Sequence, residues 1–314
     1  CAPACASGSR PRLRLVGPCV RVRFNGSVVP ICVRPSAFRV LRRALHEFQP
    51  DVVHVHEPLA PMLSLLASWR LGAPLVGTFH AHYPLSIDAL LYGAAMRCVR
   101  PVSRRLSMRL AVSRAAAESV APLGGVPLRI VPNGVDVASF ASAQPRPLPP
   151  GRRLLTVSRL EPRKGFTVLL SAFDRLAAEA DDLWLIVVGS GPCRAAVDSL
   201  PARTRARVVM LGNLPDDEVP AVYRAANAFV APAIGGESFG LVLLEAMASG
   251  LAIAGSDIPG YREVARPGRE ALLVPPGDAG ALAAAARQLL NDPSVAGRLA
   301  AAGRERVREF AWEG

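Results

Sequence analysis

The second half of the chain alternates between two kinds of hydrophobic pattern. Short apolar runs rich in Val, Leu and Ile are separated by longer segments in which apolar residues recur at helical spacing. Continuous apolar runs are typical of strands that are buried on both faces, and strands separated by helices predict a parallel sheet. We therefore expect strands at residues 153–158, 183–189, 206–211, 228–232, 252–256 and 271–275, and Ala-rich helix from Ala279 to Phe310.

The first half repeats this alternation less regularly. Strand-like runs occupy residues 52–56, 75–79, 110–113 and 129–132. A segment with four prolines, residues 141–151, separates the two halves and is typical of a linker. The predicted fold class is α/β with two Rossmann-like domains, spanning residues 1–142 and 143–314.

Charge divides unevenly between these halves. The 314 residues are 51% hydrophobic and carry a net charge of +12, and no apolar run approaches the roughly 20 residues that cross a bilayer. Residues 1–142 contain 17 Arg and 6 acidic residues, a net charge of +11. This positive charge indicates that residues 1–142 have an anionic partner, which could be nucleic acid, a membrane surface or a phosphorylated substrate. An aromatic content of 5% argues against nucleic acid, since no stripe of alternating aromatic and basic residues is present.

A basic loop follows the predicted strand at 153–158. It contains Arg159 and Lys164, the latter being the single lysine among 37 basic residues. In an open α/β sheet, ligands bind at the carboxyl ends of strands, where the N-terminus of the next helix attracts phosphate. The loop is therefore a candidate anion site, and the alternative is a solvated basic loop.

A glycine-rich segment at residues 235–250, GGESFGLVLLEAMASG, holds two glutamates. Glu237 lies beside glycines that allow close backbone approach, and Glu245 follows eight residues later. If all the intervening residues were helical, the two would stand about 12 Å apart, beyond the spacing of a hydrolytic carboxylate pair. The spacing suits two carboxylates that bind different hydroxyl-bearing parts of one long ligand. The alternative for Glu245 is a buried carboxylate satisfied by backbone groups.

All five histidines lie between residues 46 and 82, and four of them form the pairs His54/His56 and His80/His82. Alternate residues of a strand share a face, so a metal-dependent hydrolase is a rival hypothesis. No cluster of carboxylates with ligand spacing stands at later strand ends, which argues against it. His80 stands at the end of the run at 75–79, where the chain leaves the sheet and a side chain can face the expected interdomain cleft.

A basic amphipathic pattern covers residues 34–48. It places Phe38, Leu41, Leu45 and Phe48 on one helical face and directs Arg39, Arg42 and Arg43 away from it. Such a helix either lies on an anionic membrane or packs on a sheet.

Several motifs together carry a specific resemblance. From about Phe24 onward the chain resembles a retaining glycosyltransferase of family 4 with GT-B architecture, in the motifs HVHEPLAP, GTFH, AVS, VPNGVD, SRLEPRKG and GGESFGLVLLEAMASG. Within that family it is most similar to the actinobacterial enzymes that transfer mannose from GDP-mannose to phosphatidylinositol. The resemblance implies two Rossmann-like domains facing a cleft, and a first strand and glycine-rich loop that would precede residue 1, so that the N-terminal domain is incomplete. The family also continues beyond residue 314.

The resemblance also implies roles for particular residues. Arg159 and Lys164 would hold the donor diphosphate, supported by the backbone of Ser238, Phe239 and Gly240. Glu237 and His80 would contact the transferred sugar, and Glu245 the ribose. Asn25 and Ser27 would line the inositol site, and Arg39, Arg42 and Arg43 would face lipid phosphates.

No cofactor is required by these motifs, and a divalent metal such as Mg²⁺ has no ligand cluster in the sequence. The implied partners are GDP-mannose, phosphatidylinositol and an anionic membrane, with a cytoplasmic location on the inner face of the plasma membrane. Two alternatives remain open: a related transferase with another nucleotide sugar or a non-lipid acceptor, and an inactive nucleotide-binding fragment.

Overall fold

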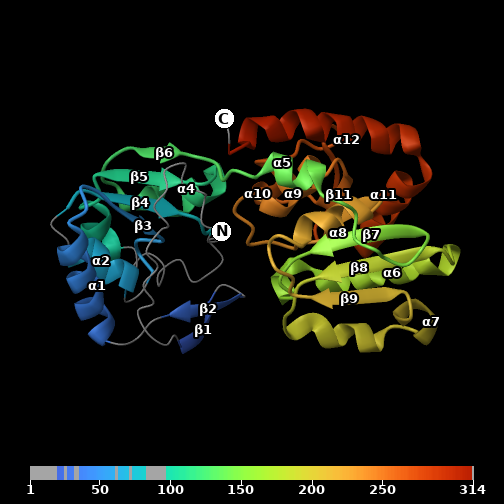
Figure 1. The fold of residues 1–314 in the computed structure, drawn as a ribbon, viewed down its shortest axis with the longest axis horizontal. Helices are drawn as coiled ribbons and strands as arrows, with labels where there is room; N and C mark the ends of the chain where they lie inside the picture. Colours follow the sequence, from blue (N-terminus) through green and yellow to red (C-terminus); the bar gives the residue numbers. More distant parts are fainter. Residues whose placement is uncertain are drawn as a thin grey trace. The chain divides into compact units, whose positions relative to one another are not determined.

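The computed structural model describes residues 20–24, 27–31, 35–60, 63–70, 73–82 and 97–312. The chain forms two compact units, the first from residues 1–112 with 116–130 and the second from residues 113–115 with 131–314 (Figure 1). This division lies ahead of the predicted boundary at residues 142 and 143. The reason is that α5 (Val137–Ser142) packs on two helices of the second unit, α8 (Val219–Ala225) and α9 (Leu241–Ala248).

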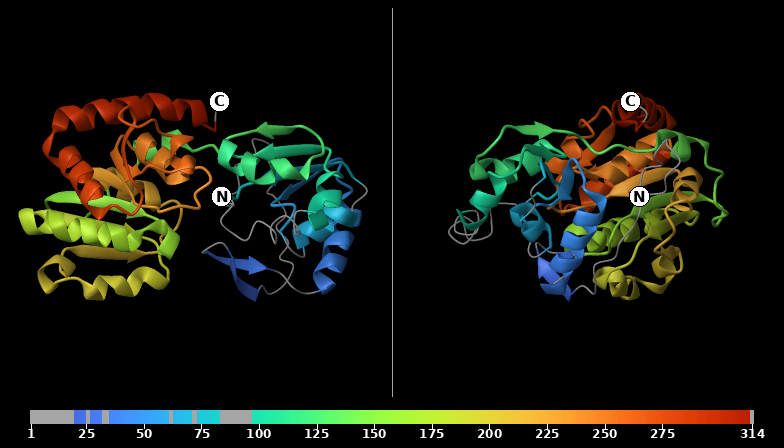
Figure 2. Two further views of the ribbon diagram at one scale, coloured as in Figure 1. Left: turned by 180° about the vertical axis from the view of Figure 1, so that it is seen from behind. Right: turned by 60° about the vertical axis from the view of Figure 1, so that its left-hand side comes forward.

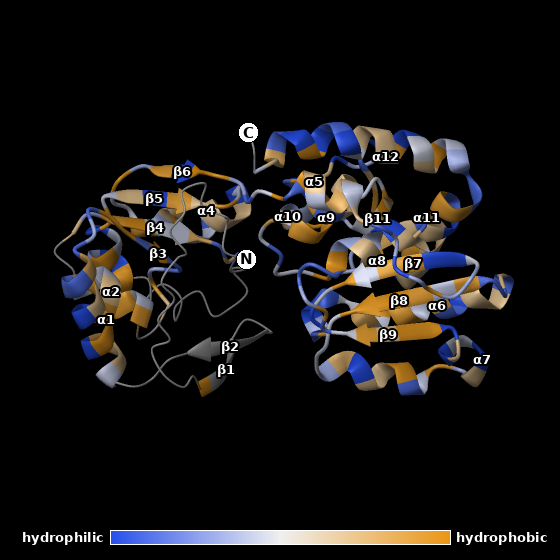
Figure 3. Ribbon diagram, in the orientation of Figure 1, coloured by the Kyte–Doolittle hydropathy of each residue, from blue (hydrophilic) through white to orange (hydrophobic). Residues whose placement is uncertain are grey.

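The second unit contains a six-stranded parallel sheet in the order β12-β11-β10-β7-β8-β9. All six predicted strands are present, with ends within two residues of the expected ones. Their bounds are β7 Arg152–Val157, β8 Leu183–Val188, β9 Val208–Gly212, β10 Ala228–Ala231, β11 Ala252–Ser256 and β12 Ala271–Val274. Figure 3 colours β8 and β9 as hydrophobic, as expected for strands covered on both faces.

The strand order of this sheet reverses between β7 and β10. The chain runs from β7 outward through β8 and β9, then returns to pair β10 with the other side of β7. Such a reversal is the topological switch point at which open α/β sheets bind ligands. The loops that follow β7 and β10 therefore begin side by side at the same edge of the sheet.

Helices cover both faces of this sheet (Figure 2). Ala228 and Val230 of β10 belong to a buried cluster with α6 (Phe166–Glu179) and α11 (Ala279–Asn291). Phe229, between them in the strand, points to the opposite face, where its ring lies 5.3 Å from that of Tyr223 in α8. The remaining helical segments of this unit are η2 Pro162–Lys164, η3 Pro192–Ser199, α7 Ala202–Arg205, α10 Pro259–Arg262, α12 Pro293–Val307 and η4 Arg308–Phe310.

The Ala-rich pattern that predicted helix from Ala279 to Phe310 is divided into α11, α12 and η4. The break between the first two lies at Asp292, whose carboxylate accepts hydrogen bonds from the backbone N–H groups of Ser294 (3.0 Å) and Val295 (3.1 Å). Pro293 follows at the first helical position, where its missing N–H costs nothing.

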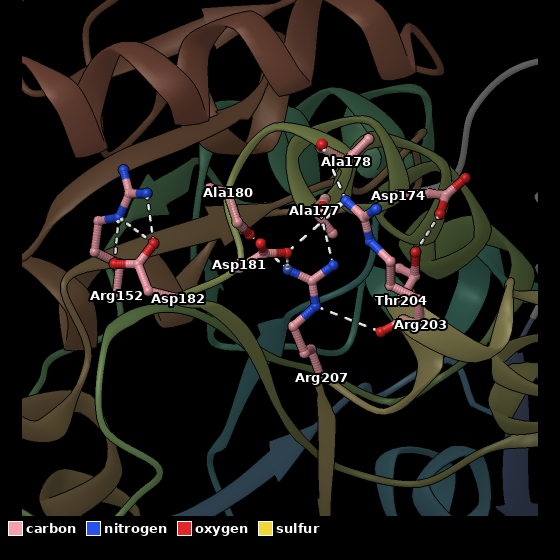
Figure 4. A network of polar contacts seen from close by, with 10 residues as sticks. All are labelled: Arg152, Asp174, Ala177, Ala178, Ala180, Asp181, Asp182, Arg203, Thr204 and Arg207. Atoms are coloured by element: carbon pink, nitrogen blue, oxygen red, sulfur yellow. Dashed lines mark hydrogen bonds and ion pairs between the residues drawn. The ribbon is translucent and has the colours of Figure 1, made fainter.

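Arginines hold the C-terminal end of α6 (Figure 4). Arg207 is nearly buried and donates to the carbonyl oxygens of Ala177 (2.7 Å) and Ala180 (2.5 Å), while Arg203 donates to that of Ala178 (3.0 Å). These bonds satisfy carbonyls that a helix end leaves without partners, and their positive charge complements the helix dipole. The network fixes α6 at the end opposite the loop that contains Lys164.

The first unit has a parallel sheet in the order β3-β4-β5-β6, with strands Val53–His56, Leu75–Phe79, Met108–Ala111 and Leu128–Ile130. The predicted strands are again present. Its helical segments include α1 Pro35–Phe48, α2 Leu63–Arg70, η1 Ala121–Leu123 and, from residue 116 onward, α4 Arg114–Val120. An antiparallel hairpin of β1 (Val20–Phe24) and β2 (Ser27–Ile31) was not predicted, because Arg residues interrupt the apolar run of β1.

Among the helices in the described ranges, none combines the length and apolarity that a bilayer crossing requires.

Candidate active site

Two loops meet at the switch point of the second unit. The backbone N–H of Ile234, after β10, donates to the carbonyl of Arg163, after β7, at 2.9 Å. Gly165 has a φ of +68°, and a Cβ added there would lie 1.9 Å from the carbonyl oxygen of Pro232. Only glycine allows this approach, so the two loops form one rigid surface at the carboxyl end of the sheet.

This surface contains a network of five charged side chains. The Lys164 ammonium and the Arg163 guanidinium both contact Oε1 of Glu237, at 2.6 Å and 2.7 Å. Arg163 also lies 3.3 Å from Glu161, which in turn lies 3.0 Å from Arg159. Three cations meet two carboxylates, so the cluster carries one net positive charge that suits an anionic ligand.

The network is largely shielded from water. The side chains of Glu161, Glu237, Lys164 and Arg163 are between 7% and 17% exposed, whereas that of Arg159 is 55% exposed. Burial lowers the pKa of Lys164 from its ordinary value, and Glu237 opposes that shift. Because Glu237 lies beside it, Lys164 keeps a partner for its charge in this desolvated position.

Two helix N-termini open toward this edge of the sheet. Gly165 precedes α6 and Gly240 precedes α9, and neither N-terminus receives a hydrogen bond from a capping side chain within the described ranges. Their N–H groups add partial positive charge to that of the cations. Arg159 and Lys164 are therefore brought to one edge, as expected from the sequence.

The backbone of residues 237–240 packs closely against Gly260 and Tyr261. A Cβ on Gly260 would lie 2.2 Å from the carbonyl oxygen of Glu237, and one on Gly240 would lie 2.8 Å from the Tyr261 ring. The Phe239 ring is buried edge-on against Phe310, with centroids 5.8 Å apart. Phe239 is thus a core residue by its side chain, so only its backbone is left for a ligand. Ser238 is half-buried in the same turn.

Glu245 lies within α9, a helix that begins only at Leu241, so residues 237–240 are not helical. Its Oε2 accepts a hydrogen bond from the Tyr223 hydroxyl at 2.8 Å. The alternative of a carboxylate satisfied by backbone groups is therefore wrong, since the partner is a side chain. The pKa of Glu245 is raised to about 7, chiefly because the carboxyl group is buried; the bond from Tyr223 lowers it and the nearby Asp216 raises it.

In the first unit, His80 is placed by residues of β3 and the turn after it. Glu57 Oε1 accepts the backbone N–H groups of His80 (2.6 Å) and Ala81 (2.7 Å). His80 Nε2 lies 2.6 Å from His56 Nδ1, and the His56 ring stacks on that of His54 at 4.5 Å. Burial and the two neighbouring histidines lower the pKa of His80, which favours its neutral form.

The metal hypothesis finds no support in these histidines. Within the described ranges, no group of three or more His, Cys, Asp and Glu side chains has the arrangement of a metal site. His54 instead contacts the Thr78 hydroxyl at 2.7 Å, and His82 lies 3.4 Å from that of Ser119.

The predicted acceptor and lipid residues are described only in part. Asn25 lies outside the described residues, and for Ser27 only the backbone is described, paired with Phe24 in the β1–β2 hairpin. Arg39, Arg42 and Arg43 are exposed on α1, as expected. The same helix exposes large apolar side chains, since Phe48 is 75% and Val40 is 41% exposed.

Sequence reasoning missed Glu161 and Arg163, although both lie between Arg159 and Lys164 in the SRLEPRKG motif. The alternation of basic and acidic residues in this motif was a signal from which the ion pairs could have been predicted. Tyr223 and Glu57 carried no such signal, because their partners are 22 and 23 residues away.

Comparison with known proteins places this site in a family. Residues 142–306 match the family model described as glycosyl transferases group 1, and residues 4–139 match glycosyltransferase family 4. The chain is 36% identical over 305 residues to the phosphatidyl-myo-inositol mannosyltransferase of Mycolicibacterium smegmatis, covering 94% of this chain and 76% of that protein. It is 31% identical over 279 residues to the glycogen synthase of Mycobacterium tuberculosis, covering 85% of this chain and 66% of that protein.

Solved structures agree on the fold. The structure of Anabaena HepE in complex with UDP has a TM-score of 0.72 at 21% identity, covering 88% of this chain and 78% of that one. The sucrose-phosphate synthase of Thermosynechococcus elongatus has a TM-score of 0.71 at 25% identity, covering 88% and 74%. Because both halves match family models and the relatives extend over nearly the whole chain, this protein belongs to the family 4 glycosyltransferases and is an enzyme with the GT-B fold.

Proposed function

We propose that this enzyme transfers mannose from GDP-mannose to the inositol ring of phosphatidylinositol, with retention of configuration. The observation that carries the proposal is the pair of cations on Glu237 at the switch point, beside two open helix N-termini. A diphosphate and a hydroxyl-rich sugar are the ligands that this combination suits. The mannosyltransferase names of the most similar relatives support the choice of sugar and acceptor.

The donor would bind along the carboxyl edge of the second sheet. Lys164 and Arg159 would contact the diphosphate together with backbone N–H groups of residues 238–240. Glu237 would accept hydrogen bonds from hydroxyls of the mannose. Glu245 would accept them from the ribose, which suits a carboxylate placed farther along the ligand.

The chemistry then depends on stabilising the leaving group. As the bond from mannose to phosphate breaks, negative charge grows on the diphosphate, and Lys164, Arg159 and the helix N-termini would stabilise that charge. In this proposal the leaving phosphate oxygen takes the proton of the inositol hydroxyl on the same face of the sugar. A neutral His80 would contact the transferred sugar without adding charge.

The acceptor would be presented at a membrane surface. Asn25 and Ser27 are the proposed inositol contacts, and Arg39, Arg42 and Arg43 the contacts to anionic lipid, on the inner face of the plasma membrane. Exposed Phe48 and Val40 support this, because an interfacial helix combines basic residues with apolar side chains that enter the lipid boundary.

A first experiment tests the donor. Calorimetric titration of the chain with GDP, UDP and ADP should give the tightest binding with GDP, and transfer of labelled mannose to phosphatidylinositol vesicles should follow. Preference for UDP would favour a second candidate, a transferase for another nucleotide sugar, which is supported by the UDP complex of the HepE neighbour and the glycogen synthase relative. Absence of binding to all three would indicate an inactive fragment.

A second experiment tests the membrane contact. Changing Arg39, Arg42 and Arg43 to Ser should reduce binding to anionic vesicles and leave GDP affinity unchanged. A matched control changes Arg194, Arg205 and Arg308, which are exposed on the second unit, and should leave vesicle binding close to that of the unchanged chain. An equal loss of vesicle binding and of GDP affinity in the variant changed at Arg39, Arg42 and Arg43 would refute a separate membrane role for these residues.

A further inference from the structure

Tyr223 is a fully buried tyrosine whose hydroxyl reaches the donor edge of the second unit. Its side chain is 0% exposed. The ring is held between Phe140 of α5, edge-on at 5.5 Å, and Phe229 of β10, tilted at 5.3 Å. Packing on both sides leaves the ring one position, so the hydroxyl has a defined direction.

The hydroxyl has two acceptors within reach and one proton to donate. Glu245 Oε2 lies 2.8 Å away, whereas the backbone carbonyl oxygen of Val242 lies 3.4 Å away. A hydrogen bond to a carboxylate at the shorter distance is the stronger of the two. Burial raises the pKa of Tyr223 well above its ordinary value, so this proton is retained at neutral pH. Tyr223 therefore donates to Glu245.

The bond uses one oxygen of the carboxylate. Across the described residues, no hydrogen bond to Oε1 of Glu245 accompanies the one that Oε2 accepts. A half-buried carboxylate in mid-helix can rotate about its side-chain torsions, and each rotation changes which oxygen faces a ligand. A donor in a rigid ring removes that freedom before any ligand arrives.

We propose that Tyr223 is a positioning residue for nucleotide recognition, which holds Glu245 by Oε2 so that Oε1 is directed at the ribose hydroxyls. This inference rests on the proposed function, in which Glu245 binds the ribose. Tyr223 itself touches no substrate. Its contribution is to reduce the conformational freedom that Glu245 would otherwise lose when the nucleotide binds.

Tyr223→Phe tests the inference, because it keeps the ring between Phe140 and Phe229 and removes only the hydroxyl. The probes are GDP and 2′,3′-dideoxy-GDP, which lacks both ribose hydroxyls. In the unchanged chain GDP should bind more tightly than the dideoxy compound. In Tyr223→Phe the affinity for GDP should fall about tenfold, as for loss of one hydrogen bond to a charged group, while the affinity for the dideoxy compound stays the same.

The outcomes separate three cases. An equal loss for both ligands would overturn the inference, because it would mean that Tyr223 matters only for packing. An unchanged GDP affinity would overturn it as well. If the unchanged chain itself does not distinguish the two ligands, the ribose role of Glu245 in the proposed function fails first. A double-mutant cycle adds a control, since Tyr223→Phe should have no further effect on GDP affinity in a chain that already carries Glu245→Ala.

Discussion

Gly165 is the position where one added methyl group should separate the loop after β7 from the loop after β10. In Gly165→Ala the new Cβ would lie 1.9 Å from the carbonyl oxygen of Pro232, at a φ of +68°. Carbon atoms approach carbonyl oxygens to about 3.3 Å, so the loops would have to move apart by more than about 1 Å. Lys164 is the preceding residue, and its ammonium would move away from Glu237.

The expected cost has two parts. A left-handed backbone costs an L-residue about 1–2 kcal/mol, and forcing an atom into packed structure costs about 1–3 kcal/mol more. Gly268 supplies the matched control, because its φ is +74° and nothing lies within 4 Å of an added Cβ. Gly268→Ala should therefore show the first cost alone, and the difference in the free energy of unfolding between the two variants should be about 1–3 kcal/mol.

Two assays test this reasoning. Urea unfolding gives the free energies, and titration with GDP gives the affinities of variants that remain folded. Gly165→Ala should be the less stable variant and should bind GDP at least about tenfold more weakly, since misplacement by about 1 Å is enough for a large loss. Equal stability of the two variants would refute the close approach, and full GDP affinity in Gly165→Ala would show that this loop does not position the diphosphate site.

Three further predictions follow from the site and its supports. Lys164→Ala should reduce GDP affinity by at least about tenfold, measured by titration. Lys164→Arg should not restore the affinity, because a planar guanidinium does not replace a compact ammonium. Unchanged GDP affinity in Lys164→Ala would exclude the anion site. Glu245, with a pKa of about 7 in the folded chain, should make GDP affinity fall from pH 8 to pH 6 as its carboxylate is protonated. Because that pKa is raised above the ordinary value, the same protonation should increase stability over this interval, and both pH dependences should be weaker in Glu245→Gln, in titrations and in urea unfolding. Arg207→Met removes the donor to the carbonyl of Ala180 and the shorter of two arginine bonds to the carbonyl of Ala177, which Arg203 also contacts; it should lower the free energy of unfolding by about 2 kcal/mol, with GDP affinity of the folded protein unchanged.

Much of the second unit follows from local patterns. Each strand there is a run of four to six residues whose own composition distinguishes it from its neighbours, so all six were predicted within two residues. Where local signals conflict, prediction was less complete. The Arg residues of β1 obscured a hairpin strand, and the Ala-rich pattern outweighed the Asp292-Pro293 helix start, although that pair is itself a local signal.

The sequence by itself determined the fold class, the strands of both parallel sheets and the two cations Arg159 and Lys164 of the loop that follows β7. Only the tertiary structure decided which side chains meet: Glu237 with Arg163, Glu245 with Tyr223, and His80 with His56. The physical reason is that hydrophobic periodicity is set by neighbours along the chain. Contacts between segments depend instead on strand order, and the return of β10 to the side of β7 is what brings the loops after these two strands together.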